Sequence, residues 1–219
     1  MNVISKEAAI ASLKFIADEI KPSSGFSLAA LGKEIAERYE FGKIPTLQET
    51  ATKGAIFQHG RLVSKKINIA EMGVFNDALT ATTTDTNSSV TVVNDLFVFL
   101  KKNFGVREPS TKPIRAFTSQ LVVEFENNPE KTFKAFDPLI ALLQDEQEAL
   151  NGIKQKIQFN RIDFASDPTQ GAATNAVFLI ERRAGVPYAT NRYFCKAYLP
   201  TGAHIRALEL LDKILGSKS

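Results

Sequence analysis

The stretch that decides the fold runs from Lys156 to Leu199 and includes KIQFNRIDF (residues 156–164), NAVFLIERR (175–183) and ATNRYFCKAY (189–198). β-Branched and aromatic side chains dominate each of these segments, which predicts three consecutive strands. The segment AGVPYA (184–189) supplies a turn between the second and the third. Because strands joined by short connections usually pair, we expect this stretch to form the heart of a sheet.

The apolar alternation changes phase inside KIQFNRIDF. Ile157 and Phe159 share one face, whereas Ile162 and Phe164 share the other. The change at residues 160–161 predicts either a β-bulge or a strand that is buried on both faces.

Upstream of this stretch, helical periodicity predicts two N-terminal helices, over residues 5–20 and 28–41. Joined by a short Gly-containing turn, they would form a helical hairpin. Residues 42–53 then have the composition of a linker. The chain is therefore expected to divide into a hairpin over residues 1–42 and a larger domain over residues 54–219.

The segment FSLAALGKEIAERY (residues 26–39) is similar to the opening of small winged-helix modules. The resemblance ends there, and it implies that the second helix could read DNA. The exposed face of that helix would carry Lys33, Glu34, Glu37, Arg38 and Glu40. Because this mixed, partly acidic face is poor for phosphate, we favour a packing or docking role.

The remaining elements follow the same periodicity rules. We expect a hairpin within residues 55–65, an extended run over 66–84, a helix from Asp85 to Gly105, a strand over 116–126, and helices over 138–150 and 201–215. This order predicts an α+β fold, with a mostly antiparallel sheet of about six or seven strands, helices packed on one face, and the N-terminal helical hairpin.

Composition narrows the classes of function. The 219 residues carry a formal net charge of only +3, but bases are in excess over residues 101–115 and 181–219. A single cysteine, Cys195, excludes an internal disulfide, and two histidines make a Cys/His zinc site unexpected. We expect Cys195 to be a small buried apolar residue, and we expect no cofactor or metal.

The sequence also bears on location. Its first residues carry charges throughout, unlike a signal peptide. No apolar run approaches the roughly 20 residues of a membrane span. We therefore expect a soluble cytoplasmic protein without a membrane partner.

One polar constellation stands out as a candidate binding site. It consists of Asn160, Arg161, Asp163, Arg182, Arg183, Tyr188, Asn191 and Arg192. If the last three strands are neighbours, the arginines could together bind a carboxylate, a phosphate or an acidic peptide. The competing interpretation is cross-strand ion pairing with Glu181 and Asp163.

Three functions follow from these observations. The sequence contains no phosphate loop, cofactor fingerprint or nucleophile–base pair, so our leading hypothesis is a non-catalytic protein-interaction or assembly module, binding a protein partner or itself. One alternative is nucleic-acid binding through residues 101–115 and 181–219. The other is a small enzyme that acts on an anionic substrate at the arginine cluster. No catalytic residue is assigned, because catalytic groups converge in space rather than in sequence.

Overall fold

The computed structural model describes residues 1–22, 28–153, 156–165, 169 and 177–217. Its strands are β1 (Asn2–Lys14), β2 (Ala55–Leu62), β3 (Ile67–Val74), β4 (Ala78–Thr83), β5 (Ile114–Glu124), β6 (Arg161–Ala165), β7 (Val177–Arg182) and β8 (Arg192–Ala197). Its α-helices are α1 (Leu28–Arg38), α2 (Leu47–Lys53), α3 (Thr86–Phe104), α4 (Asp137–Asn151) and α5 (Thr201–Gly216). Short 3₁₀ segments are η1 (Val63–Lys65), η2 (Pro129–Phe136) and η4 (Tyr188–Thr190).

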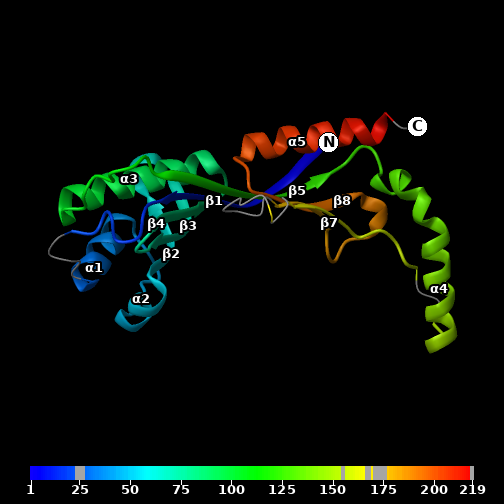
Figure 1. The fold of residues 1–219 in the computed structure, drawn as a ribbon, viewed down its shortest axis with the longest axis horizontal. Helices are drawn as coiled ribbons and strands as arrows, with labels where there is room; N and C mark the ends of the chain where they lie inside the picture. Colours follow the sequence, from blue (N-terminus) through cyan, green and yellow to red (C-terminus); the bar gives the residue numbers. More distant parts are fainter. Residues whose placement is uncertain (23–27, 154–155, 166–168, 170–176, 218–219) are drawn as a thin grey trace. The chain divides into compact units, whose positions relative to one another are not determined.

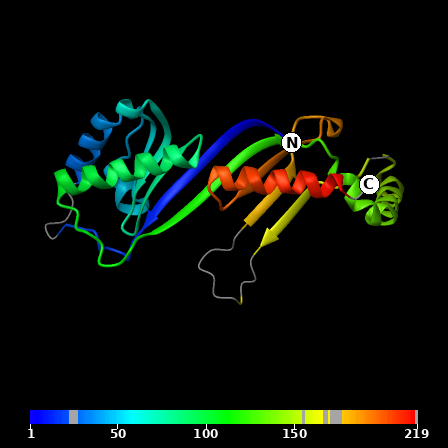
Figure 2. The same ribbon diagram turned by 90° about the horizontal axis from the view of Figure 1, so that it is seen from above.

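Within these residues, the strands form one antiparallel sheet in the order β2-β3-β4-β1-β5-β8-β7-β6 (Figures 1 and 2). The predicted α+β class with an antiparallel sheet is therefore confirmed. The predicted number of strands is wrong, because the described residues form eight. That the helices pack on a single face of the sheet stays a prediction.

The predicted N-terminal helical hairpin is also wrong, because the chain begins with strand β1 rather than with a helix. Ala9, Ala11 and Leu13 alternate as buried residues along this strand. β1 pairs antiparallel with β4, from Ala9 opposite Thr83 to Lys14 opposite Ala78. The alanines favour a helix locally, but helix propensity is worth only roughly a few tenths of a kcal/mol per residue. Burial of these side chains in a paired strand outweighs that preference. The second predicted helix is present as α1.

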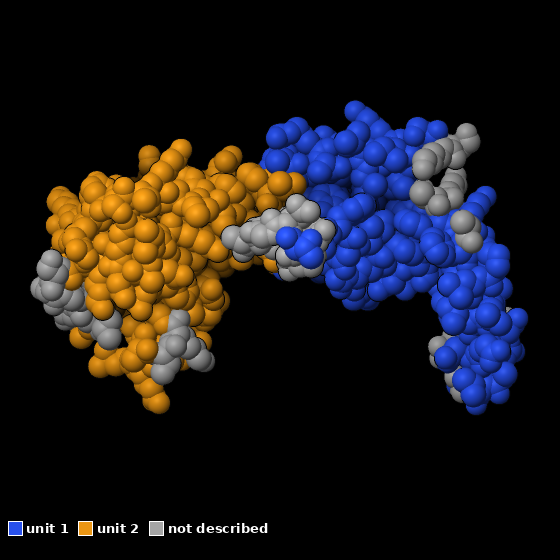
Figure 3. Space-filling model, in the orientation of Figure 1, with its two compact units in different colours: residues 1–5, 121–197, 202–219 blue, residues 6–120, 198–201 orange. Residues whose placement is uncertain are grey.

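The chain divides into two compact units (Figure 3). Unit 1 comprises residues 1–5, 121–197 and 202–219, and unit 2 comprises residues 6–120 and 198–201. Strands β1 and β5 contribute residues to both units. The predicted boundary between residues 1–42 and 54–219 stays a prediction.

The two units repeat one order of elements. In each, a first strand is followed by helical segments, a three-stranded meander and a closing helix: β1, α1, α2, β2-β3-β4 and α3, then β5, η2, α4, β6-β7-β8 and α5. Read from one edge of the sheet the order is β2-β3-β4-β1, and read from the other edge it is β6-β7-β8-β5. Each strand therefore has the same place as its counterpart in the other half, with β1 beside β5 at the centre. The sequence shows no repeat, so the duplication is visible only in topology.

Unit 2 is built around a large apolar core. Aromatic and aliphatic side chains of α1, β2, β3, β4 and α3 meet there, including Tyr39, Phe57, Met72, Leu79 and Leu96. Helix α3 begins where the Asp85 carboxylate accepts from the backbone N–H groups of the first turn, and it ends at Gly105 with φ 66°. These are the two boundaries expected from the sequence.

Strand and linker boundaries differ from expectation in unit 2. The extended run over residues 66–84 is two strands, β3 and β4, and the expected hairpin over residues 55–65 is one strand, β2, with a 3₁₀ turn. The expected linker contains helix α2, which begins with a capping box between Thr46 and Glu49.

Unit 1 has a smaller core. Leu121, Val123 and Phe125, on and just after β5, pack with residues of β7, β8 and α5, including Ile180 and Leu208. The strand predicted over residues 116–126 is therefore present as β5. Strand β6 begins only at Arg161, and the carbonyl of Asn160 accepts from the backbone N–H of Arg182 at 2.9 Å. The phase change in the sequence therefore marks the start of the strand, and residues 156–160 are not strand.

Candidate functional site

Arg182 is the buried member of the predicted arginine cluster, with only 5% of its surface exposed. Its guanidinium donates from Nε to the carbonyl of Phe159 at 3.2 Å and from Nη1 to the carbonyl of Tyr188 at 2.9 Å. The same group lies 4.3 Å from the centre of the Tyr188 ring and 5.2 Å from that of Tyr193. Two carbonyls and two aromatic faces thus surround the buried charge, which holds the turn after β7 against β8.

Asn191 and Arg192 connect β8 with β5. Asn191 has φ 54°, and its amide donates to the carbonyls of Phe125 at 2.6 Å and Asn127 at 3.2 Å. Arg192 Nε donates to the Glu124 carboxylate at 2.9 Å. Ion pairing across strands therefore occurs here, although the acid is Glu124 rather than Glu181.

The other members of the cluster lie on β6 and at the end of β7. Arg161 Nε donates to the Asp163 carboxylate at 2.7 Å, two residues along the same strand. The backbone N–H of Arg183 donates to the carbonyl of Arg192 at 3.0 Å. The structure thus brings Arg182 to Tyr188, Arg161 to Asp163, and Arg183 to Arg192. Binding of an anion at this cluster stays a prediction.

The basic segment 101–115 also makes contacts within unit 2. Lys101 forms an ion pair with Glu108, and its Nζ lies 5.7 Å from the centre of the Phe97 ring. Arg115 donates to the side-chain oxygen of Asn94 at 3.1 Å. Nucleic-acid binding by this segment stays a prediction.

Two buried side chains, Cys195 and His204, are kept neutral by burial. Cys195 is fully buried, and desolvation raises the pKa of its thiol, so it stays protonated and behaves as the small buried residue expected. His204 is also buried, and desolvation lowers its pKa to about 4. Among the described residues, no group of three or more His, Cys, Asp or Glu side chains could hold a metal ion. None of the helices in the described part of the chain is long and apolar enough to cross a membrane.

The surface that sequence reasoning missed lies on α4. Leu139, Leu142, Leu143 and Leu150 share one face of this helix, and 51%, 55%, 44% and 79% of their respective surfaces are exposed. We call these residues the α4 leucine face. Their spacing of three, four and seven residues is visible in the sequence. Periodicity shows only that a helix has an apolar face, however, and not whether the chain covers it.

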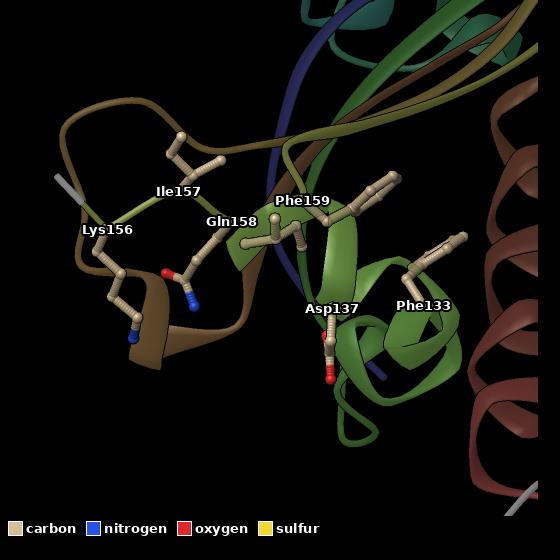
Figure 4. A pocket seen from close by; sticks show the side chains of 7 residues that line it. Phe133, Asp137, Lys156, Ile157, Gln158 and Phe159 are labelled. Atoms are coloured by element: carbon tan, nitrogen blue, oxygen red, sulfur yellow. The ribbon is translucent and has the colours of Figure 1, made fainter. Parts of the chain in front are cut away.

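A different side of α4 joins the helix to its unit. Ile140 and Gln144 are half-buried, and the Gln144 amide donates to the carbonyl of Ile157 at 3.4 Å. At the base of the helix, Phe133 of η2 stacks on Phe159 with ring centres 4.1 Å apart. A small hollow of about 160 Å³ lies there. Figure 4 shows Phe133 and Phe159 among the side chains that line it. These contacts fix α4 by one side and leave its leucines outside.

The charge of α4 is unusual for this chain. Asp137, Asp145, Glu146 and Glu148 give it four acids, and it contains no Lys or Arg, whereas the whole chain is net positive. Three of the acids lie in the C-terminal half of the helix, and Glu148 lies in its last turn, where the helix dipole disfavours negative charge. The α4 leucine face is therefore an exposed apolar surface on an acidic helix.

No protein-family model matches this chain, and no curated protein sequence matches it.

Proposed function

We propose that this protein is a non-catalytic interaction module that binds another protein chain through the α4 leucine face. The observation that carries the proposal is the exposure of four leucines on one side of one helix. Scattered exposed apolar residues are ordinary on protein surfaces, but Leu139, Leu142 and Leu143 lie together, and Leu150 follows on the same side beyond Glu146. Apolar residues gathered in this way mark an interaction site. An amphipathic helix with anchors at these spacings is a common protein-recognition element.

The energetics favour a covered α4. Fully burying one leucine is worth about 1.5–3 kcal/mol, so four leucines that are 44% to 79% exposed leave several kcal/mol of burial unused in the isolated chain. Only part of this would appear as affinity, because association also costs translational, rotational and side-chain entropy.

The helix is also formed in advance of binding. Pro138 occupies its first turn, and Gly152 ends it with φ 70°. Between them, leucine, alanine, glutamine and glutamate predominate, all of which are good helix formers. Because α4 need not fold on binding, less of the burial energy is spent on ordering the chain.

Photo-crosslinking inside cells that express this protein would test the proposal. A photo-reactive residue at position 142 should give a covalent adduct with a polypeptide, because a bound chain would cover this side of α4. The matched control places the photo-reactive residue at position 98 on α3 instead, where Val98 is also exposed, at 64% of its surface. The double substitution Leu143→Gln and Leu150→Gln should abolish the adduct while preserving the helix, since glutamine is also a good helix former.

The proposal fails if position 142 gives no adduct beyond that at position 98. It also fails if the adduct survives the loss of both leucines. In the first case no protein chain covers α4, and in the second a chain lies near position 142 without depending on the α4 leucine face.

A further inference from the structure

Helix α5 carries a second exposed apolar surface in the same unit. Its inner side, which includes His204, Leu208 and Leu215, is buried. On its outer side, Leu210 is 59% exposed and Ile214 is 44% exposed. Arg206, four residues before Leu210, and Lys213, three residues after it, lie on the same side and are exposed. We call Arg206, Leu210, Lys213 and Ile214 the α5 outer face.

We propose that the α4 leucine face of one copy of this chain binds the α5 outer face of a second copy. This inference rests on the proposed function and names the partner. The two surfaces match in kind, since each has apolar side chains at successive helical turns. They are opposite in net charge, because α4 has acids only, whereas the α5 outer face has two bases and the exposed Glu209 lies at its edge, three residues after Arg206.

The positions of the charges on each helix suit this pairing. Glu146 lies in the leucine strip, three residues after Leu143 and four before Leu150, and Asp145 precedes it. On α5, Arg206 and Lys213 lie on one side of the apolar pair, four residues before and three residues after Leu210. When two helices pack through apolar residues, flanking charges of opposite sign select the partner.

Other occupants of α4 fit its chemistry less well. Two α4 helices would bring four acids against four acids, and like charges disfavour such a pair. Nucleic acid and anionic lipid surfaces would repel the same acids. A second copy supplies both the apolar surface and the positive charge that α4 lacks.

The arrangement also constrains the assembly. Because α4 and α5 are different surfaces of one chain, the contact either occurs twice in a two-fold dimer or repeats from copy to copy. In both cases the mass in solution exceeds the 24.1 kDa of one chain.

Charge reversal with rescue tests the inference, with mass measured by light scattering or sedimentation. We expect wild-type protein at up to about 100 μM, a range that detects micromolar dissociation constants, to show at least twice the mass of one chain. Asp145→Lys with Glu146→Lys should shift the protein to monomer, and so should Arg206→Glu with Lys213→Glu. Combining all four substitutions should restore association, because the charges again oppose each other. The matched control reverses two exposed acids on α1, Glu34→Lys with Glu37→Lys, and should leave the mass unchanged.

Misfolding does not account for the expected pattern. Lysine is as good a helix former as glutamate and a better one than aspartate, so the α4 variant should retain its helix in circular dichroism. Rescue by the fourfold variant further requires that both single-helix variants fold.

Two results would overturn the inference. The first is that the wild-type protein stays monomeric over this concentration range. The second is that the wild type associates, but neither charge reversal lowers its mass or the fourfold variant fails to restore association. If the wild type is monomeric but position 142 still crosslinks to a different polypeptide, the proposed function stands and the self-association inference alone fails.

Discussion

The buried His204 should make the folded state less stable as the solution becomes acidic. In the fold its imidazole is fully buried on α5, and its ring meets the Phe178 ring at 74° with centres 5.6 Å apart. Burial lowers the pKa of His204 from 6.5 to about 4, because the charged form would lose its hydration. In the unfolded chain the same imidazole regains an ordinary pKa near 6.5.

The sign follows from proton binding. Between pH 6.5 and about 4 the unfolded state binds a proton at His204 that the folded state does not, so acidification favours unfolding. The full interval between the two pKa values corresponds to about 3 kcal/mol, and roughly 2 kcal/mol of this should be lost between pH 7 and pH 4.5.

Urea unfolding at a series of pH values would measure this loss. Carboxylates also titrate over the range, so the contribution of His204 is the difference between wild type and His204→Asn. The matched control is His59→Asn, because His59 is exposed and has φ 59°, which asparagine tolerates. Removing His204 should flatten the pH dependence, whereas removing His59 should not.

A direct measurement can refute this reasoning. Proton NMR of the folded protein gives the pKa of each histidine ring, and a value above 6 for His204 would show that its burial does not control its charge. An equal pH dependence for wild type and His204→Asn would lead to the same conclusion.

Two further predictions concern charged groups that organise each unit. In unit 2, Asp95 accepts from Tyr39 Oη at 2.7 Å and from Arg38 Nη2 at 3.0 Å, so Asp95→Asn should cost about 2 kcal/mol in chemical denaturation; a cost below that of the exposed control Asp77→Asn would contradict it. In unit 1, Arg182→Lys should cost about 2 kcal/mol, because lysine cannot reach both carbonyls with a planar fork. The exposed Arg161→Lys should change stability by less than about 0.5 kcal/mol, and equal effects of the two would mean that burial of Arg182 is not what matters.

Local signals predicted much of the secondary structure. Asp85 and Gly105 bound α3 as expected, and Gly152 ends α4, because helix caps depend on the residues at the boundary itself. The strand predicted over residues 116–126 is also present as β5, with Leu121 and Val123 buried as their spacing indicates and Val122 buried between them.

Errors arose where distant residues decide the outcome. Residues 5–20 satisfy a helical pattern, yet residues 2–14 form β1, because β4 offers a partner with matching small side chains. The arginine cluster was predicted from sequence proximity, but its contacts depend on partners such as Glu124 and Phe125, which lie more than sixty positions upstream of Arg192 and Asn191.

The sequence by itself determined the α+β class, the caps of α3 and the amphipathic character of α4 and α5. Only the tertiary structure decided that β1 is a strand, that the element order is duplicated, and that Leu142 of α4 and Leu210 of α5 are left uncovered. The physical reason is that caps and periodicity act over one or two turns of chain. Burial, by contrast, is a property of whatever else the fold brings to the same place.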